Sequence, residues 1–95
     1  MNTTSKSSGD LGVSAAQLVV GKSILTGVNI HAAAADVVVT IYDNTSAAGT
    51  ILFKYTLDLS LEGLAKYICL PDVRADTGLW VVVTGTGANV VVHYK

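Results

Sequence analysis

Short runs of β-forming residues alternate along this chain with turn-forming residues. Val, Ile, Thr, Tyr and Trp dominate the runs, and these side chains suit a pleated sheet. Turn signals rich in Gly, Asn, Asp and Ser recur every roughly 8–14 residues, which is typical of a sandwich or small barrel. We expect strands over residues 17–20, 23–33, 36–43, 50–59, 66–70, 79–84 and 89–95. The pattern therefore predicts an all-β fold, a single small β-sandwich of about seven or eight short antiparallel strands.

Two connecting segments carry expectations of their own. Residues 71–78, PDVRADTG, are predicted to form a turn, because Pro and Asp favour turns and Arg74 lies between two aspartates for surface ion pairs. Residues 60–67, SLEGLAKY, match a single turn of helix, although Gly63 lowers the helix propensity there.

The first residues differ in composition from the rest. Residues 1–14 are rich in Ser, Thr, Asn and Gly, and we expect a flexible or extended N-terminal arm that docks on another chain. Residues 15–95 are the predicted β-sandwich domain. The arm lacks the apolar core of a signal peptide, and no apolar run approaches the ~20 residues that span a bilayer. We therefore expect a soluble protein that is made in a cytoplasm and has no membrane partner.

The strand predicted at 36–43 is apolar on both faces. Val37, Val39 and Ile41 occupy one face, while Val38, Thr40 and Tyr42 occupy the other. A strand with one face in water alternates apolar and polar residues, and this one does not. Either the strand lies between two layers, or its second face packs on a neighbouring subunit. The small size of the chain favours the subunit contact.

Size and composition also favour contact with a neighbouring subunit. The 95 residues are 51% hydrophobic and 14% charged, which is much apolar surface for a small chain to bury. Cys69 is the single cysteine, so no internal disulfide supports the core. The net charge is −1 and no basic run is present, which argues against a nucleic-acid partner. A homo-oligomer is expected to supply the missing burial.

Candidate catalytic groups lack the partners that catalysis needs. Asp58 and Glu62 are four residues apart, as are Asp72 and Asp76, but neither pair falls in a convincing helix that would place both carboxylates on one face. No G-x-S-x-G nucleophile motif is present. Cys69 lies in the apolar run YICLP and is expected to be a small core residue. The sequence therefore predicts no enzyme.

Metal and cofactor motifs are also missing. His31 and His93 have no Cys or second His at ligand spacing, and residues 43–46 lack the spacing of a calcium loop. Gly85 and Gly87 precede a strand where a phosphate-binding loop would precede a helix, so we interpret them as hairpin glycines. We expect neither metal nor cofactor.

The aromatic residues leave an alternative open. Trp80 together with Tyr42, Tyr55, Tyr67 and Tyr94 would form a stacking platform for sugars if the fold gathered them. Trp80 lies within the apolar run GLWVVVT, where an aromatic side chain more often belongs to a core or an interface. A carbohydrate-binding module is thus the second hypothesis.

Two segments carry a family resemblance. VVVTIYDNTSAAGTIL (37–52) and LPDVRADTGLWVVVTGTGANVVVHY (70–94) resemble small structural proteins of tailed bacteriophages, and SILTGVNIHAAAADV (23–37) extends the likeness over residues 23–95. The resemblance implies a β-sandwich or jelly-roll-like virion component. It further implies a capsid decoration (cement) protein on the head exterior, commonly trimeric, with a tail, neck or fibre component as the alternative.

Under this interpretation the contacts are made by apolar residues. The expected partners are further copies of the chain, in a homotrimer, and the major capsid protein or other virion proteins on the capsid surface. The expected interface residues are Leu11, Val13, Leu18, Trp80, Val82, Val91 and Tyr94.

Overall fold

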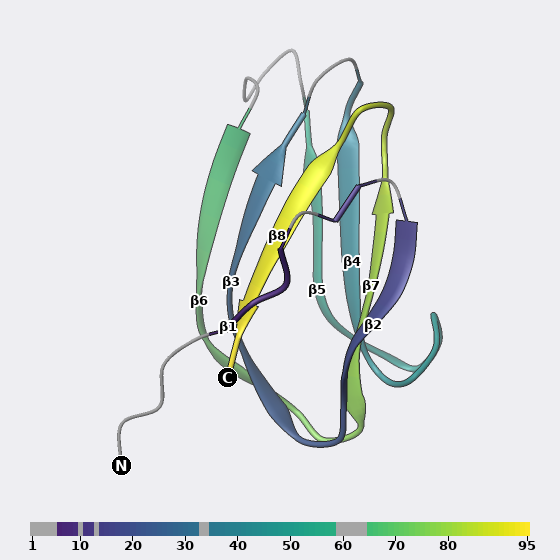
Figure 1. Ribbon diagram of the computed structural model, residues 1–95, viewed down its shortest axis with the longest axis vertical. Coiled ribbons are helices and arrows are strands. Elements are labelled where there is room, and N and C mark those ends of the chain that lie inside the picture. The colour runs from purple at the N-terminus through teal and green to yellow at the C-terminus, as the bar shows by residue number, and fades with distance from the viewer. Residues whose placement is uncertain (1–5, 10, 13, 33–34, 59–64) are drawn as a thin grey trace.

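The computed structural model describes residues 6–9, 11–12, 14–32, 35–58 and 65–95, and over these residues the chain is all-β (Figure 1). This confirms the predicted β-sandwich: eight strands form two antiparallel sheets of four strands each. The strands are β1 (Lys6–Ser7), β2 (Ser14–Val20), β3 (Ser23–His31), β4 (Val37–Asp43), β5 (Thr50–Leu57), β6 (Ala65–Ala75), β7 (Gly78–Thr84) and β8 (Asn89–Tyr94).

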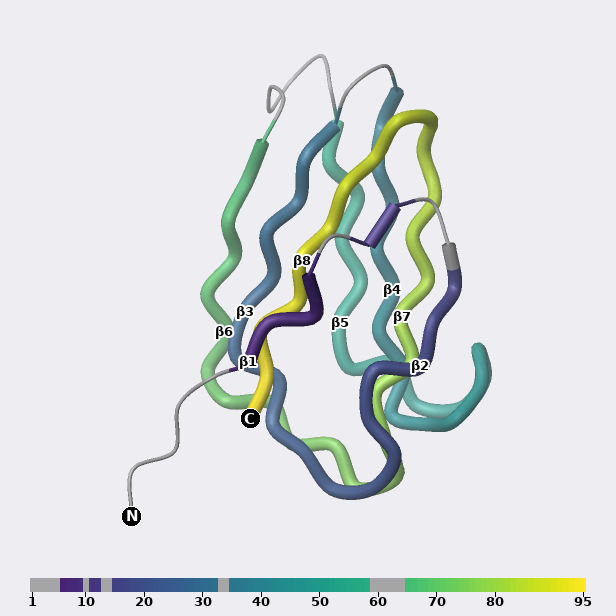
Figure 2. The backbone as a smooth tube through the Cα atoms, in the orientation of Figure 1, coloured from purple at the N-terminus to yellow at the C-terminus, as the bar shows by residue number. Residues whose placement is uncertain are grey.

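The strand order is that of a jelly roll. One sheet has the order β1-β8-β3-β6 and the other β2-β7-β4-β5. The first strand pairs with the last, the second with the seventh, the third with the sixth and the fourth with the fifth. The chain is thus a long antiparallel ribbon rolled into two layers, and the backbone tube in Figure 2 allows this path to be followed.

The core lies between the two sheets because each strand turns alternate residues inward. In β4, Val37, Val39 and Ile41 are fully buried, and the inner strands β3, β7 and β8 alternate in the same way. The buried hydrophobic residues are Leu25, Val28, Ile30, Ala32, Val37, Val39, Ile41, Leu57, Ala75, Leu79, Val81, Val83, Ala88, Val90 and Val92.

The second face of β4 has no covering layer in the described part of the chain. β4 is an inner strand, paired with β7 on one side and β5 on the other, but the molecule has only two sheets there. Over the described residues, β4 therefore does not lie between two layers of the chain. Val38, Thr40 and Tyr42 face outward, away from the sandwich interior.

The turn expected at residues 71–78 is shorter than predicted: β6 continues through Ala75, and the chain turns at Asp76 and Thr77 before β7 begins. Between the pairs Leu25–Val73 and Gly27–Cys69 the register shifts, so that three residues of β6 lie opposite Thr26 alone. The extra residues form a bulge, in which Asp72 adopts φ 45°. β6 is an edge strand, and an edge tolerates both proline and a bulge.

Two further expectations can be compared with the structure of β6. Residues 60–64 of the expected helical turn lie outside the described residues, and residues 65–67 belong to β6, so they are not helical. The expectation that Cys69 is a core residue is wrong, since its side chain is exposed. It pairs with Gly27 on the outward side of an edge strand, and an apolar neighbourhood in sequence did not reveal that orientation.

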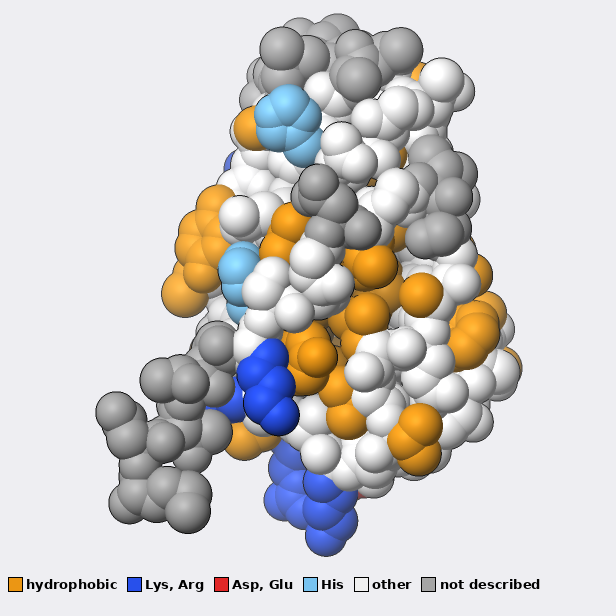
Figure 3. All heavy atoms as spheres, viewed as in Figure 1, with side chains coloured by type: hydrophobic (Ala, Val, Ile, Leu, Met, Phe, Trp, Pro, Cys, Tyr) orange, Lys and Arg blue, Asp and Glu red, His pale blue; other side chains and the backbone are white. Residues whose placement is uncertain are grey.

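Part of the expected N-terminal arm lies on the sheet of its own chain. β1 pairs with β8, and the backbone of Leu11 exchanges hydrogen bonds of 2.7 and 2.9 Å with that of Val90. The chain then passes from one sheet to the other to begin β2 (Figure 1). Figure 3 shows apolar side chains gathered along the seam between β8 and β2 that this passage borders.

Candidate functional site

The outward residues of the β2-β7-β4-β5 sheet form a nearly uncharged surface, which we call the β7/β4 face. Its rows follow the strand register, with Gln17, Trp80, Tyr42 and Ile51 side by side in one row. Lys54 is the one charged side chain among those described on it. The face consists of Ala15, Gln17, Val38, Thr40, Tyr42, Ile51, Lys54, Thr56, Trp80, Val82 and Thr84.

Trp80 and Tyr42 form the centre of the β7/β4 face. They are directly opposed on neighbouring strands, where cross-strand aromatic pairs pack closely. Both are half-buried, and the Nε1 atom of Trp80 is buried without a hydrogen-bond partner in the described residues. Thr40 beside Val82 is only 8% exposed. The hydrocarbon, hydroxyl and amide groups of this face are suited to packing against another protein surface.

The structure does not bring the expected interface residues together on one surface. Trp80 and Val82 lie on the β7/β4 face, whereas Val91 lies on the outward side of the other sheet. Val13 lies outside the described residues. Leu11, Leu18 and Tyr94 pack against the chain's own core.

The aromatic platform considered from the sequence is not assembled either. Of the four tyrosines, only Tyr42 lies beside Trp80. Tyr55 and Tyr94 pack against the core, and Tyr67 projects from the opposite sheet, where its ring meets His93 edge-on at 6.1 Å between centroids. No sugar platform therefore forms around Trp80 and all the tyrosines.

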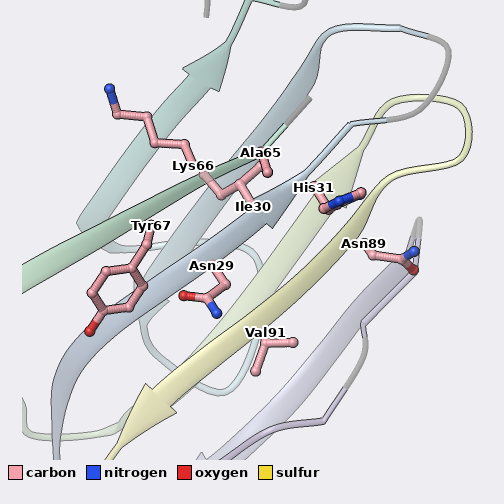
Figure 4. A pocket seen from close by; sticks show the side chains of 8 residues that line it. All are labelled: Asn29, Ile30, His31, Ala65, Lys66, Tyr67, Asn89 and Val91. Atoms are coloured by element: carbon pink, nitrogen blue, oxygen red, sulfur yellow. The ribbon is translucent and has the colours of Figure 1, made fainter. Parts of the chain in front are cut away.

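A second surface feature lies on the outward side of the β1-β8-β3-β6 sheet. It is a shallow hollow of about 520 Å³ over β6, β3 and β8, which we call the Tyr67 hollow (Figure 4). Tyr67, Asn29 and Val91 occupy one row of the register, and His31 and Asn89 oppose each other in the next. Sequence reasoning missed this grouping because the residues come from three strands whose pairing the pattern does not specify.

Asp43, at the end of β4, fixes the turn between β6 and β7. Its carboxylate accepts hydrogen bonds from the backbone N–H groups of Thr77 (2.7 Å), Asp76 (3.1 Å) and Gly78 (3.3 Å). These bonds, that of Thr77 foremost, lower the pKa of Asp43 from its ordinary value of 3.8. The role is structural, since an ionised carboxylate satisfies three donors at a turn.

Two ion pairs at the surface join residues of β6, the β6–β7 turn and the C-terminus. Arg74 Nε lies 3.0 Å from Asp76 Oδ1, as expected from the sequence, and Lys95 Nζ lies 3.5 Å from Asp72 Oδ2. Over the described residues, no group of three His, Cys, Asp or Glu side chains is placed to hold a metal ion.

Comparisons with family models, curated proteins and solved structures find no match to this chain. In the described part of the chain, no helix is long and apolar enough to cross a membrane.

Proposed function

We propose that this chain is a non-enzymatic virion structural protein of a tailed bacteriophage, a decoration protein that oligomerises and stabilises the capsid exterior. The observation that carries the proposal is the β7/β4 face, an outward surface that includes Trp80, Tyr42, Val38 and Val82 and has a single charged side chain among its described residues. Such a surface is suited to protein contact, because interface centres are depleted of charge and enriched in aromatic residues.

The size of the chain sets the scale of that contact. A specific interface hides about 800 Å² on each partner. This is about a sixth of the 5037 Å² surface of the chain, so one face of the sandwich is sufficient. In a symmetric trimer each copy would use two different regions, one for each neighbour, and the two together would cover about a third of the surface.

Two further points support the proposal. The sequence resembles small phage structural proteins over residues 23–95. The jelly-roll strand order occurs in viral capsid domains as well as in lectins, which makes this support an analogy at the level of fold. Many weakly bound copies would hold a shell through avidity, without any chemistry.

The direct test is to locate the protein on particles. Virions of the phage that encodes the chain are purified and analysed by quantitative mass spectrometry and immunogold labelling. Many copies per particle on the head exterior are expected. If the label is confined to the tail or to fibres, the protein is a tail or fibre component and not a decoration protein. If the protein is absent from the particles, both roles are overturned.

A pair of matched substitutions tests the β7/β4 face in the same assay. Val82→Lys places a charge at its centre and is expected to abolish occupancy of the particles, because a buried unpaired charge opposes docking. Val91→Lys is the control, since Val91 is equally half-buried on the outward side of the opposite sheet. Equal occupancy of both variants would contradict the assignment of this face.

A further inference from the structure

The Tyr67 hollow combines an exposed aromatic ring with several polar side chains. Tyr67 is 58% exposed, and Asn29, His31 and Asn89 are exposed as well. Figure 4 shows Tyr67 at one side of the hollow, Asn29 and Val91 across its floor, and His31 and Asn89 toward its end. The volume of about 520 Å³ falls within the range of about 300–1,000 Å³ typical of small-ligand sites.

Three polar side chains of the hollow are available to hydrogen-bond to a ligand. Over the described residues, the side chains of Asn29, His31 and Asn89 make no hydrogen bond to the protein. Each asparagine amide offers donors and an acceptor at once, and the imidazole also has two nitrogen atoms that can hydrogen-bond. A ligand whose groups both donate and accept, as hydroxyl groups do, matches this set.

The charge of the hollow narrows the class of ligand. Among the described residues no Asp, Glu or Arg lines it, and the Lys66 ammonium group lies 5.7 Å from the ring centroid of Tyr55, a residue of the other sheet (β5). In Figure 4 the Lys66 side chain extends away from the other labelled side chains. From the described lining residues, a phosphate or carboxylate ligand would meet no cation held in the hollow, and an ammonium ligand would meet no carboxylate.

We propose that the Tyr67 hollow is a binding site for a neutral saccharide. The apolar C–H face of a sugar ring packs on the exposed Tyr67 ring, and its hydroxyl groups bond to Asn29, Asn89 and His31. The hollow is open and shallow, so the affinity for a single sugar unit is about millimolar, and several copies on one assembly would raise it by avidity. This site is separate from the β7/β4 face and does not depend on the function proposed above.

The test uses the full chain and nuclear magnetic resonance. Glucose, galactose, mannose and N-acetylglucosamine are titrated separately, after a glycan array has indicated larger candidates. At least one saccharide is expected to shift the side-chain amide signals of Asn29 and Asn89, with saturation. If none shifts them and the array shows no binding, the proposal is wrong, and it is equally wrong if inorganic phosphate is the ligand that shifts them.

Variants separate this site from the rest of the surface. Tyr67→Ala is expected to weaken binding about tenfold, and Asn29→Ala about threefold to tenfold, whereas Tyr67→Phe retains the ring and most of the affinity. Thr84→Ala, exposed on the opposite sheet, is the matched control and should bind as the parent does. Signal shifts centred on Trp80 and Tyr42, or unchanged affinity of Tyr67→Ala, would overturn the proposal. Circular dichroism of each variant verifies that it is folded.

Discussion

At the scale of single residues, Asp43 links two parts of the roll that are more than thirty positions apart in sequence. Its carboxylate satisfies the backbone N–H groups of Asp76, Thr77 and Gly78, which the β6–β7 turn would otherwise leave to solvent. The same contacts stabilise the ionised form of Asp43 and lower its pKa. Stability and protonation are thus coupled at this residue.

The pH dependence of stability tests the role of Asp43. Because the folded-state pKa is lowered below 3.8, the contribution is present above about pH 4 and is lost as the pH falls through the folded-state value. Asp43→Asn is expected to lower the free energy of unfolding by about 1–2 kcal/mol at pH 7, a range reduced for solvent screening. The deficit should shrink toward pH 3, as measured by urea unfolding at both pH values.

Asp76→Asn is the control for that measurement. The Asp76 side chain pairs with Arg74 at an exposed site, and such pairs contribute about 0–1 kcal/mol. A variant of Asp43 that is as stable as the parent at pH 7, or whose deficit grows in acid, would contradict the account.

Gly85, in the turn between β7 and β8, provides a second test at this scale. It adopts φ 122°, and a Cβ atom there would collide with the carbonyl oxygen of Asp36. Gly85→Ala is expected to cost about 2–4 kcal/mol from strain and overlap. Gly12→Ala is the matched control, because a Cβ there meets nothing within 4 Å, and its thermal unfolding should match that of the parent. Equal midpoints for the two variants would exclude the strain argument.

The exposure and neighbours of individual residues were harder to predict from the sequence than the strands and turns that contain them. The hairpin role of Gly85 follows from turn chemistry, and the fold agrees with it. The exposure of Cys69 and the grouping of Tyr67 with Asn29 depend on the outward orientation of an edge strand, which a one-residue change of register reverses. Local sequence does not specify that register.

At the scale of elements, the pairing of β1 with β8 shields what would otherwise be a free sheet edge. Ser8 bonds to Val92 through both its backbone and its hydroxyl group, and Leu11 pairs with Val90. An unshielded edge strand invites pairing with other chains. The described part of residues 1–14 therefore contributes to the chain's own fold, whereas the contact of an arm with another chain stays a prediction.

Truncation and substitution test this role of the N-terminal segment. A variant lacking residues 1–12 is expected to unfold at a lower temperature and to aggregate more readily, since β8 becomes an edge. Leu11→Ala should lower the free energy of unfolding by about 1–2 kcal/mol, because Leu11 packs on the core. Val20→Ala is the control, since Val20 is 76% exposed. Unchanged stability of the truncated chain, measured by calorimetry, would refute the role.

Element prediction from the sequence succeeded where alternation was regular. The strands from Val37 to Asp43 and from Gly78 to Thr84 follow strongly β-forming runs bounded by turn residues, and both appear close to the expected positions. β6 was cut short because Pro71 and Asp72 indicate a turn in isolation. In the sheet the pairing with β3 continues past them, and the bulge absorbs the extra residues.

At the scale of the whole molecule, the two outer surfaces of the sandwich differ in chemistry. The β7/β4 face is nearly uncharged, and the opposite sheet bears the polar Tyr67 hollow. Composition predicted excess apolar surface but not its location, which depends on how the strands are ordered in the two sheets. We propose protein contact for the first surface and ligand contact for the second.

Sedimentation velocity across a range of concentrations tests the central claim, that this chain shares its β7/β4 face with other copies. From about 1 to 100 µM the full chain is expected to sediment increasingly as an oligomer, with three 9.8 kDa chains as the favoured species. Val82→Lys should remain a folded monomer, while Val91→Lys should associate as the parent does. A parent chain that stays monomeric at every concentration would contradict the account.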